Sequence, residues 1–75
     1  MKSINFKKFS LIDFLRLNDD NVVEVLVPKE DVGGQEFKGF RHQAKHIEKD
    51  GIVRFEETEA DDGSIKVLVL KIKNT

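Results

Sequence analysis

The sequence contains no cysteine, no tryptophan and no tyrosine, and only one proline. Without cysteine, neither a disulfide nor a thiolate metal site can hold the chain together, so its stability has to come from packed Leu, Ile, Val and Phe side chains. No apolar run approaches the roughly 20 residues that cross a bilayer. The short apolar stretch at residues 11–17 carries Asp13 and Arg16, unlike a secretory signal. We therefore expect a cytoplasmic protein with no membrane contact.

The length and composition predict one small folded domain over residues 1–75. A chain of this size buries only about 60% of the surface that its unfolded form exposes, which leaves a thin core. Charged residues make up 36% of the sequence and hydrophobic residues 39%, a balance that favours folding over disorder. So thin a core offers no enclosed cleft for acid–base chemistry, and we expect neither an enzyme nor a cofactor.

Charge is segregated along the chain, although the net charge is only −1. Residues 37–54 carry a net charge of +3, whereas residues 10–36 and 55–65 each carry −5. The two ends, residues 1–9 and 66–75, each carry +3. The near-zero total argues against a protein that coats nucleic acid by bulk charge, but it leaves local patches of either sign for a partner.

Two helices are predicted by their start signals and their apolar spacing. Ser10 is placed to cap the first helix by accepting a hydrogen bond from the amide of Asp13. Phe9 and Phe14 have the spacing of a hydrophobic staple around that cap. The second helix, residues 36–49, carries an apolar stripe at i, i+3, i+7 and i+10. The stripe consists of Phe37, Phe40, Ala44 and Ile47.

Three strands follow from the remaining apolar segments. Residues 22–27 are rich in β-branched side chains and apolar at nearly every position, as in a central strand buried on both faces. Residues 52–59 and 64–72 form a hairpin around Asp62-Gly63, because glycine supplies the positive φ of a tight turn. The strand at 64–72 is also apolar on both faces, which predicts that it is covered on both sides or bulged. Residues 1–8 form either an edge strand or a flexible segment.

The predicted fold class is therefore α+β. We expect a small single domain with the order helix-strand-helix-hairpin, in which two helices pack on a three-stranded antiparallel sheet. No repeat or linker divides the chain. The side chains expected between the helices and the sheet are Phe14, Leu15, Phe37, Phe40 and Ile47.

The predicted helix 36–49 is the first candidate site, because its polar surface is basic. A helix fits the major groove of duplex DNA, where Lys and Arg meet phosphates or guanine edges and Gln can contact adenine. An ordinary amphipathic helix with a solvated polar face would show the same pattern. The candidate DNA-binding residues are Lys38, Arg41, His42, Gln43, Lys45 and Lys49.

Residues 37–72 resemble the last helix and the wing of winged helix-turn-helix DNA-binding domains. The resemblance rests on Ala44, Ile47, the run Lys49-Asp50-Gly51-Ile52-Val53 and the hairpin tip Asp61-Asp62-Gly63. It implies a winged-helix-like fold and a role in transcription regulation. It would place Arg41, His42, Gln43 and Lys45 in the groove, with Lys38 and Lys49 on phosphates. A homodimer would suit this function, because such regulators commonly bind paired half-sites.

The acidic hairpin at residues 55–65 supports a different function. It holds five acids and no base, whereas the wing of a DNA-binding domain is usually basic. Acidic side chains along a ribbon suit docking on a basic partner, although charged hairpin tips often only keep a protein soluble. The alternative is therefore a non-enzymatic protein–protein interaction module, an inhibitor or adaptor, that uses this hairpin or the basic helix.

The spacing of the two histidines gives little support for a metal site. His42 and His46 are four residues apart, so on a helix they share a face and could share a metal ion. The sequence offers no cysteine and no third histidine to complete the site. We therefore expect no bound metal.

Overall fold

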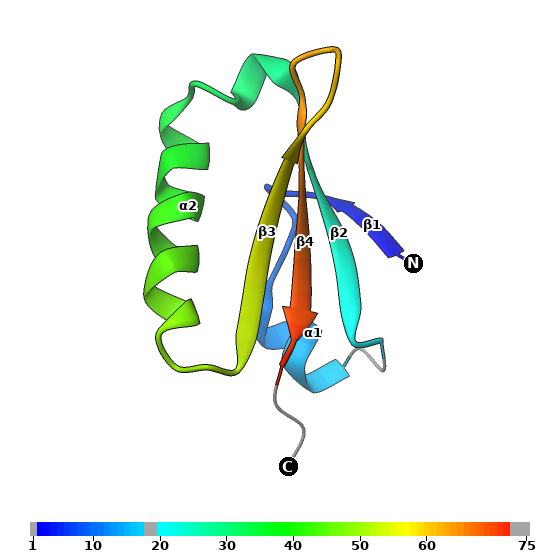
Figure 1. The fold of residues 1–75 in the computed structure, drawn as a ribbon, viewed down its shortest axis with the longest axis vertical. Helices are drawn as coiled ribbons and strands as arrows, with labels where there is room; N and C mark the ends of the chain where they lie inside the picture. Colours follow the sequence, from blue (N-terminus) through cyan, green and yellow to red (C-terminus); the bar gives the residue numbers. More distant parts are fainter. Residues whose placement is uncertain (1, 18–19, 73–75) are drawn as a thin grey trace.

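The computed structural model describes residues 2–17 and 20–72 (Figure 1). The elements along the chain are β1 (Lys2–Asn5), α1 (Leu11–Leu17), β2 (Val22–Val27), the 3-10 turn η1 (Lys29–Asp31), α2 (Gln35–Glu48), β3 (Val53–Glu59) and β4 (Ile65–Lys71). The bounds of α2 and of the three predicted strands differ from expectation by no more than one residue. The α+β class is confirmed.

The sheet contains four strands in the order β1-β2-β4-β3. Strand β4 is antiparallel to both of its neighbours, whereas β1 runs parallel to β2. The three predicted strands do pair antiparallel, but the prediction of a three-stranded sheet is wrong in strand number, because a fourth strand pairs with β2 in parallel. Residues 2–5 form the additional edge strand, and α1 in the crossover returns the chain so that β1 and β2 can run in the same direction.

Both helices pack on one face of this sheet, and the core lies between them and the strands. The inward positions of β2 and β4 alternate with outward ones, as the period of a strand requires. Phe40 and Ile47 are partly buried against this core. The expected packing of Leu15 is wrong: it is 38% exposed, because the adjacent Phe14 takes the inward position on α1. The buried cluster consists of Phe6, Phe14, Val23, Val25, Val27, Phe37, Val53, Ile65, Val67 and Val69.

Local signals fix the ends of the elements. The amide of Asp13 donates to Ser10 Oγ at 3.3 Å, and the ring centroids of Phe9 and Phe14 lie 6.2 Å apart. Gly63 at the hairpin tip has φ +90°, as a tight turn requires. Asp62 Oδ1 accepts from both the amide and the hydroxyl of Ser64, at 2.9 and 2.6 Å. These hydrogen bonds lower the pKa of the Asp62 carboxyl.

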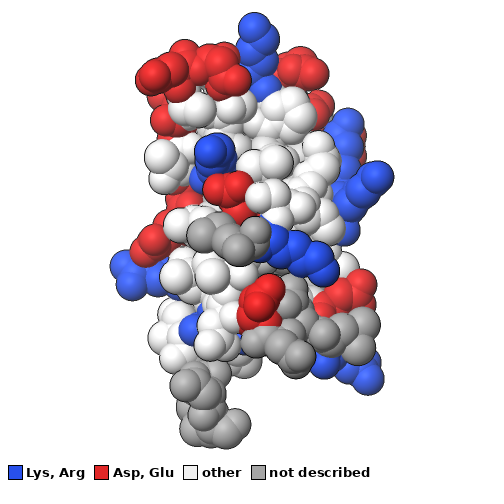
Figure 2. Space-filling view, turned by 90° about the vertical axis from the view of Figure 1, so that its right-hand side faces the viewer, with Lys and Arg blue, Asp and Glu red and all other residues white. Residues whose placement is uncertain are grey.

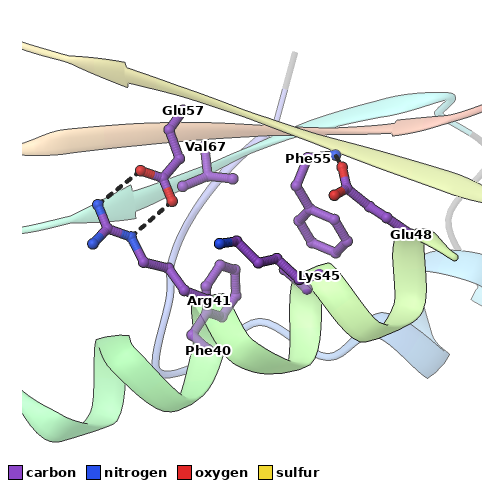
Figure 3. A pocket seen from close by; sticks show the side chains of 8 residues that line it. Phe40, Arg41, Lys45, Glu48, Phe55, Glu57 and Val67 are labelled. Carbon is purple, nitrogen blue, oxygen red and sulfur yellow. Dashed lines mark hydrogen bonds and ion pairs between the residues drawn. The ribbon is translucent and has the colours of Figure 1, made fainter.

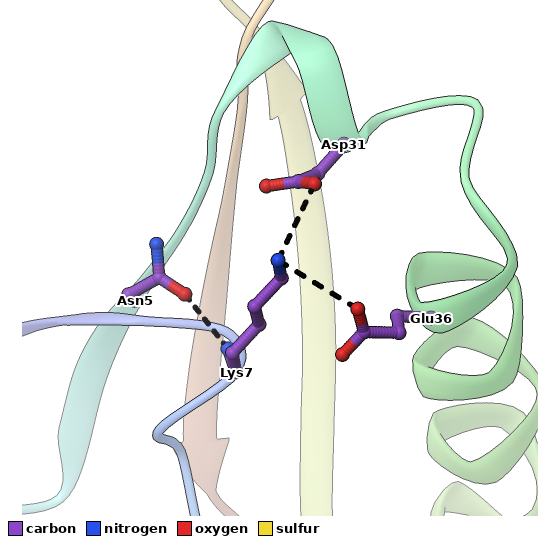
Figure 4. A network of polar contacts seen from close by, with 4 residues as sticks. All are labelled: Asn5, Lys7, Asp31 and Glu36. Atoms are coloured by element: carbon purple, nitrogen blue, oxygen red, sulfur yellow. Dashed lines mark hydrogen bonds and ion pairs between the residues drawn. The ribbon is translucent and has the colours of Figure 1, made fainter.

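The segment before α2 is tied to the chain that follows β1. Lys7 Nζ lies 3.6 Å from Asp31 Oδ1 in η1 and 3.6 Å from Glu36 Oε1 in the first turn of α2 (Figure 4). The backbone N–H of Lys7 donates to Asn5 Oδ1 at 2.9 Å, which turns the chain out of β1. Among the described residues between β2 and α2, the only helical element is the 3-10 turn η1. A helix-turn-helix unit has a full helix at this place.

Candidate functional site

A groove of about 380 Å³ runs between α2 and the edge strand β3 (Figure 3). Phe40 and Ala44 from the helix and Phe55 and Val67 from the sheet form its apolar floor. Charged side chains from both elements stand along its sides. These are Arg41, Lys45, Glu48 and Glu57.

Arg41 makes the most specific polar contact in this groove. Its Nε and Nη2 donate to the two carboxylate oxygens of Glu57, at 2.9 and 2.8 Å. The guanidinium carbon also lies 4.4 Å from the centroid of the Phe37 ring. The hydrogen bond that Arg41 donates to Glu57 raises the pKa of Arg41 above its ordinary value. The side chain that was expected to contact DNA is thus engaged by an acid of the hairpin.

Most of the predicted DNA-binding residues do lie together on α2. At about 100° per residue, Arg41, Lys45, Lys38, Lys49 and His42 fall within an arc of about 100° on one flank of the helix. Gln43 points about 150° away from the middle of that arc. All except Arg41 are exposed. The helix therefore presents one basic flank, and Gln43 is not part of it.

Glu48, which was not singled out from the sequence, connects the end of α2 to β3. Its Oε2 accepts the backbone N–H of Phe55 at 2.7 Å (Figure 3). That N–H points away from β4. In this hairpin the backbone groups of the even-numbered residues form the hydrogen bonds between β3 and β4, so the N–H of the odd-numbered Phe55 points outward. The amide of Ile72 donates to the carbonyl of Ile52, and that of Ala60 to the carbonyl of Ser64. Glu48 thereby blocks one position on the free edge of β3.

We expect the Arg41–Glu57 pair to contribute only modestly to stability, because both side chains are about 40% exposed. Arg41→Ala should lower the free energy of unfolding by about 1 kcal/mol, since it removes the ion pair and the contact with Phe37. Urea unfolding followed by circular dichroism measures the change. A double-mutant cycle with Glu57→Gln isolates the pair, and a coupling energy near zero would show that the contact is not maintained in solution.

A second candidate surface is the face of the sheet that the helices leave uncovered, here called the open face. Pairing across β3, β4 and β2 arranges its side chains in three rows. The first row is Arg54, Leu70 and Val22; the second is Glu56, Leu68 and Glu24; the third is Thr58, Lys66 and Leu26. No element within residues 2–17 and 20–72 packs over these rows.

The open face is apolar along its middle. Val22, Leu26, Leu68 and Leu70 are all partly exposed there. The alternation continues past the strand ends to Ile52 and Ile72, which are 41% and 53% exposed. Figure 2 shows the side turned away from α2: uncharged residues occupy much of its middle, and acids gather at the end that carries the hairpin tip.

The sequence did contain a signal for this surface. Residues 64–72 are apolar at both odd and even positions, and from this pattern we predicted a strand covered on both sides or bulged. That prediction is wrong for the described part of the chain: the strand is regular, and only its Ile65, Val67 and Val69 face is buried. Leu68 and Leu70 on the other face are partly exposed, and none of the described elements packs over them.

The structure offers no metal centre and no membrane-spanning helix in the part of the chain that it describes. His42 and His46 are both exposed on α2, and no group of three or more His, Cys, Asp or Glu side chains among residues 2–17 and 20–72 is arranged to hold an ion. Neither helix described there has the length and apolar character needed to cross a bilayer.

Comparison with known proteins found no match: neither a protein-family model, nor a curated protein, nor a solved structure is significantly similar to this chain. The inferences about function therefore rest on the surfaces described above.

Proposed function

We propose that this chain is a non-enzymatic protein-interaction module that binds a protein partner through its open face. The observation that carries the proposal is the partly exposed apolar middle of that face, formed by β2 and β4. Apolar residues exposed singly are normal on a protein surface, but a contiguous apolar set on one face of a sheet is unfavourable in water, and covering it with a partner is favourable.

The charges around the apolar middle also suit a protein partner. Lys66, Arg54, Glu24 and Glu56 border it, so that both signs are present at the rim. An apolar centre with a mixed polar rim is the usual anatomy of a protein–protein interface. The face carries no aromatic side chain, since all six Phe residues lie elsewhere, and it therefore lacks the stacking platform of a single-stranded nucleic-acid binder.

Duplex DNA binding by α2 is the second candidate function, supported by the gathering of four Lys or Arg side chains and His42 on one flank. Two observations weaken it. Arg41 is already held by Glu57, so a phosphate would have to compete with a bidentate carboxylate. Glu57 of β3 and Glu48 of α2 line the groove next to that flank and would repel the DNA backbone.

Site-specific photo-crosslinking in cells distinguishes the two functions. A photoreactive side chain at Lys66 reports on the open face, and one at Lys45 reports on the basic flank of α2; both positions are exposed. We expect a protein adduct at Lys66 that is lost when Leu68→Thr and Leu70→Thr are introduced together. Threonine removes the apolar contact but keeps a strand-forming side chain.

The matched control is Thr58→Ala, a change at the exposed rim of the same face, which should leave the adduct in place. A nucleic-acid adduct at Lys45 with no protein adduct at Lys66 would overturn the proposal and establish the DNA alternative. In that case, amide NMR shifts along α2 on adding duplex DNA should weaken steeply as salt rises.

A further inference from the structure

Resting on the proposed function, we infer that the partner at the open face is a second copy of this chain, packed sheet against sheet about a two-fold axis. A two-fold interface brings the same patch of both copies together, so a patch can bind itself only if it is self-complementary. The open face meets that requirement in its charge, its register and its apolar middle.

The charge of the open face is balanced, unlike that of the neighbouring segments. Its three rows hold two acids, Glu24 and Glu56, and two bases, Arg54 and Lys66. Two copies of this face therefore meet without net repulsion. The hairpin tip, by contrast, presents Asp61 and Asp62 and would repel its own copy.

The register allows Arg54 and Glu56 of the two copies to face each other, while Glu24 of each copy faces Val22 of the other. A two-fold axis that lies in the interface, perpendicular to the strands and between the rows of Leu68 and Leu70, brings the first row of one copy over the second row of the other. Leu70 then packs on Leu68 of the other copy. In the same arrangement Arg54 faces Glu56 of the other copy, and this contact occurs twice. Within one chain these two side chains are already neighbours, at 3.3 Å.

The size of the face predicts a weak dimer. Four strands of four to seven residues, spaced by about 4.8 Å, give a projected area of about 380 Å². A standard interface buries about 800 Å² per partner, so even with interdigitated side chains this one is at the small end. We expect a dissociation constant in the micromolar range, about 1–100 μM.

This dimer has a consequence for α2. Because α2 packs on the opposite face of the sheet, the α2 helices of the two copies would lie on opposite outer surfaces of the dimer. Both basic flanks would remain accessible, but they would not face one side of a duplex together. The dimer therefore does not provide the paired half-site geometry of a DNA-binding regulator.

Charge reversal at the paired positions tests the inference, with sedimentation velocity over a concentration series as the readout. Arg54→Glu places two acids over two acids in a homodimer, and Glu56→Arg places two bases over two bases. Each variant alone should raise the dissociation constant at least about tenfold. In a 1:1 mixture the two acids of one chain face the two bases of the other, and a dimer should form again.

Circular dichroism checks that each variant is folded, and Lys49→Glu, on the far side of the molecule, is the matched control.

The outcomes separate this inference from the proposed function. A wild-type chain that sediments as a monomer up to 1 mM, about ten times the upper end of the expected range, overturns the second copy as the occupant. So does a dimer that both charge variants leave unchanged, or a mixture that does not associate. If a different protein is still crosslinked at Lys66 and released by Leu68→Thr with Leu70→Thr, the interaction module stands with another partner. If no protein adduct forms there either, both proposals fail.

Discussion

Phe37→Ala is expected to lower the free energy of unfolding to about 0–2 kcal/mol, so that a substantial part of the population unfolds. Phe37 is the fully buried member of the aromatic cluster, 5.8 Å from the Phe6 ring and 6.1 Å from the Phe40 ring between centroids. Removing a buried phenyl ring costs about 3–5 kcal/mol, through lost burial and the cavity that remains. The free energy of unfolding of a small domain is about 5 kcal/mol or little more, so this single change removes most of it.

The contacts of Phe37 explain why we expect the loss of unfolding free energy to lie near the upper end of this range. Its ring contacts Phe6, whose amide donates to the carbonyl of Leu26 and so anchors the end of β1 on β2. The ring also supports the guanidinium of Arg41. Loss of Phe37 therefore loosens α2, the end of β1 and the Arg41–Glu57 contact together.

Urea unfolding followed by far-ultraviolet circular dichroism measures this effect, because the chain has no Trp or Tyr to report by fluorescence. Lys38→Ala, at the exposed neighbouring position, is the control and should stay within about 0.5 kcal/mol of the wild type. Phe37→Leu keeps an apolar side chain and should remain folded with a smaller loss. An unfolding midpoint for Phe37→Ala close to that of Lys38→Ala would show that the aromatic cluster is not the core in solution.

Local chemistry allowed most of the elements to be predicted. Ser10 and its capping contact define the start of α1, and the apolar stripe that begins at Phe37 defines the buried side of α2. Gly63 marks the hairpin. Each of these signals acts over a few residues, so each is visible in the sequence without knowledge of the fold.

The pairing of distant segments could not be predicted in the same way. Strand β1 has only four residues, and nothing within Lys2–Asn5 specifies a parallel partner more than twenty residues away. The open face shows the same difficulty at the level of function. An apolar set such as Val22, Leu68 and Leu70 predicts that something covers it, but a helix of the same chain and a partner would leave the same pattern.

The contact between Arg41 and Glu57 depends on the register of β3 and could not be predicted from the helix alone. Arg41 was expected to be available to DNA because its place on the helix is polar. Glu57 stands in phase with Val53 and Phe55 on β3 and therefore projects towards α2 rather than into solvent on the open face. The alternation Val53, Phe55, Glu57 was visible in the sequence, but its meaning depended on knowing which face of β3 the helix covers.

Glu48→Ala is expected to have the second-largest effect on stability. The carboxylate of Glu48 accepts the partly buried amide of Phe55 at 2.7 Å, and alanine leaves that N–H without its acceptor. An unsatisfied buried donor costs about 1–3 kcal/mol. Because the N–H belongs to the free edge of β3, the change also unblocks a position at which another strand could pair. We therefore expect a lower unfolding midpoint together with a greater tendency to aggregate.

Hydrogen exchange at the Phe55 amide tests this mechanism directly. In the wild type the amide should be protected although it does not bond to β4, and in Glu48→Ala its protection should fall far more than that of Arg54, which bonds within the hairpin. Glu48→Gln keeps an acceptor oxygen at the same place and should retain most of the protection. Equal protection of Phe55 in all three proteins would mean that Glu48 does not hold the edge.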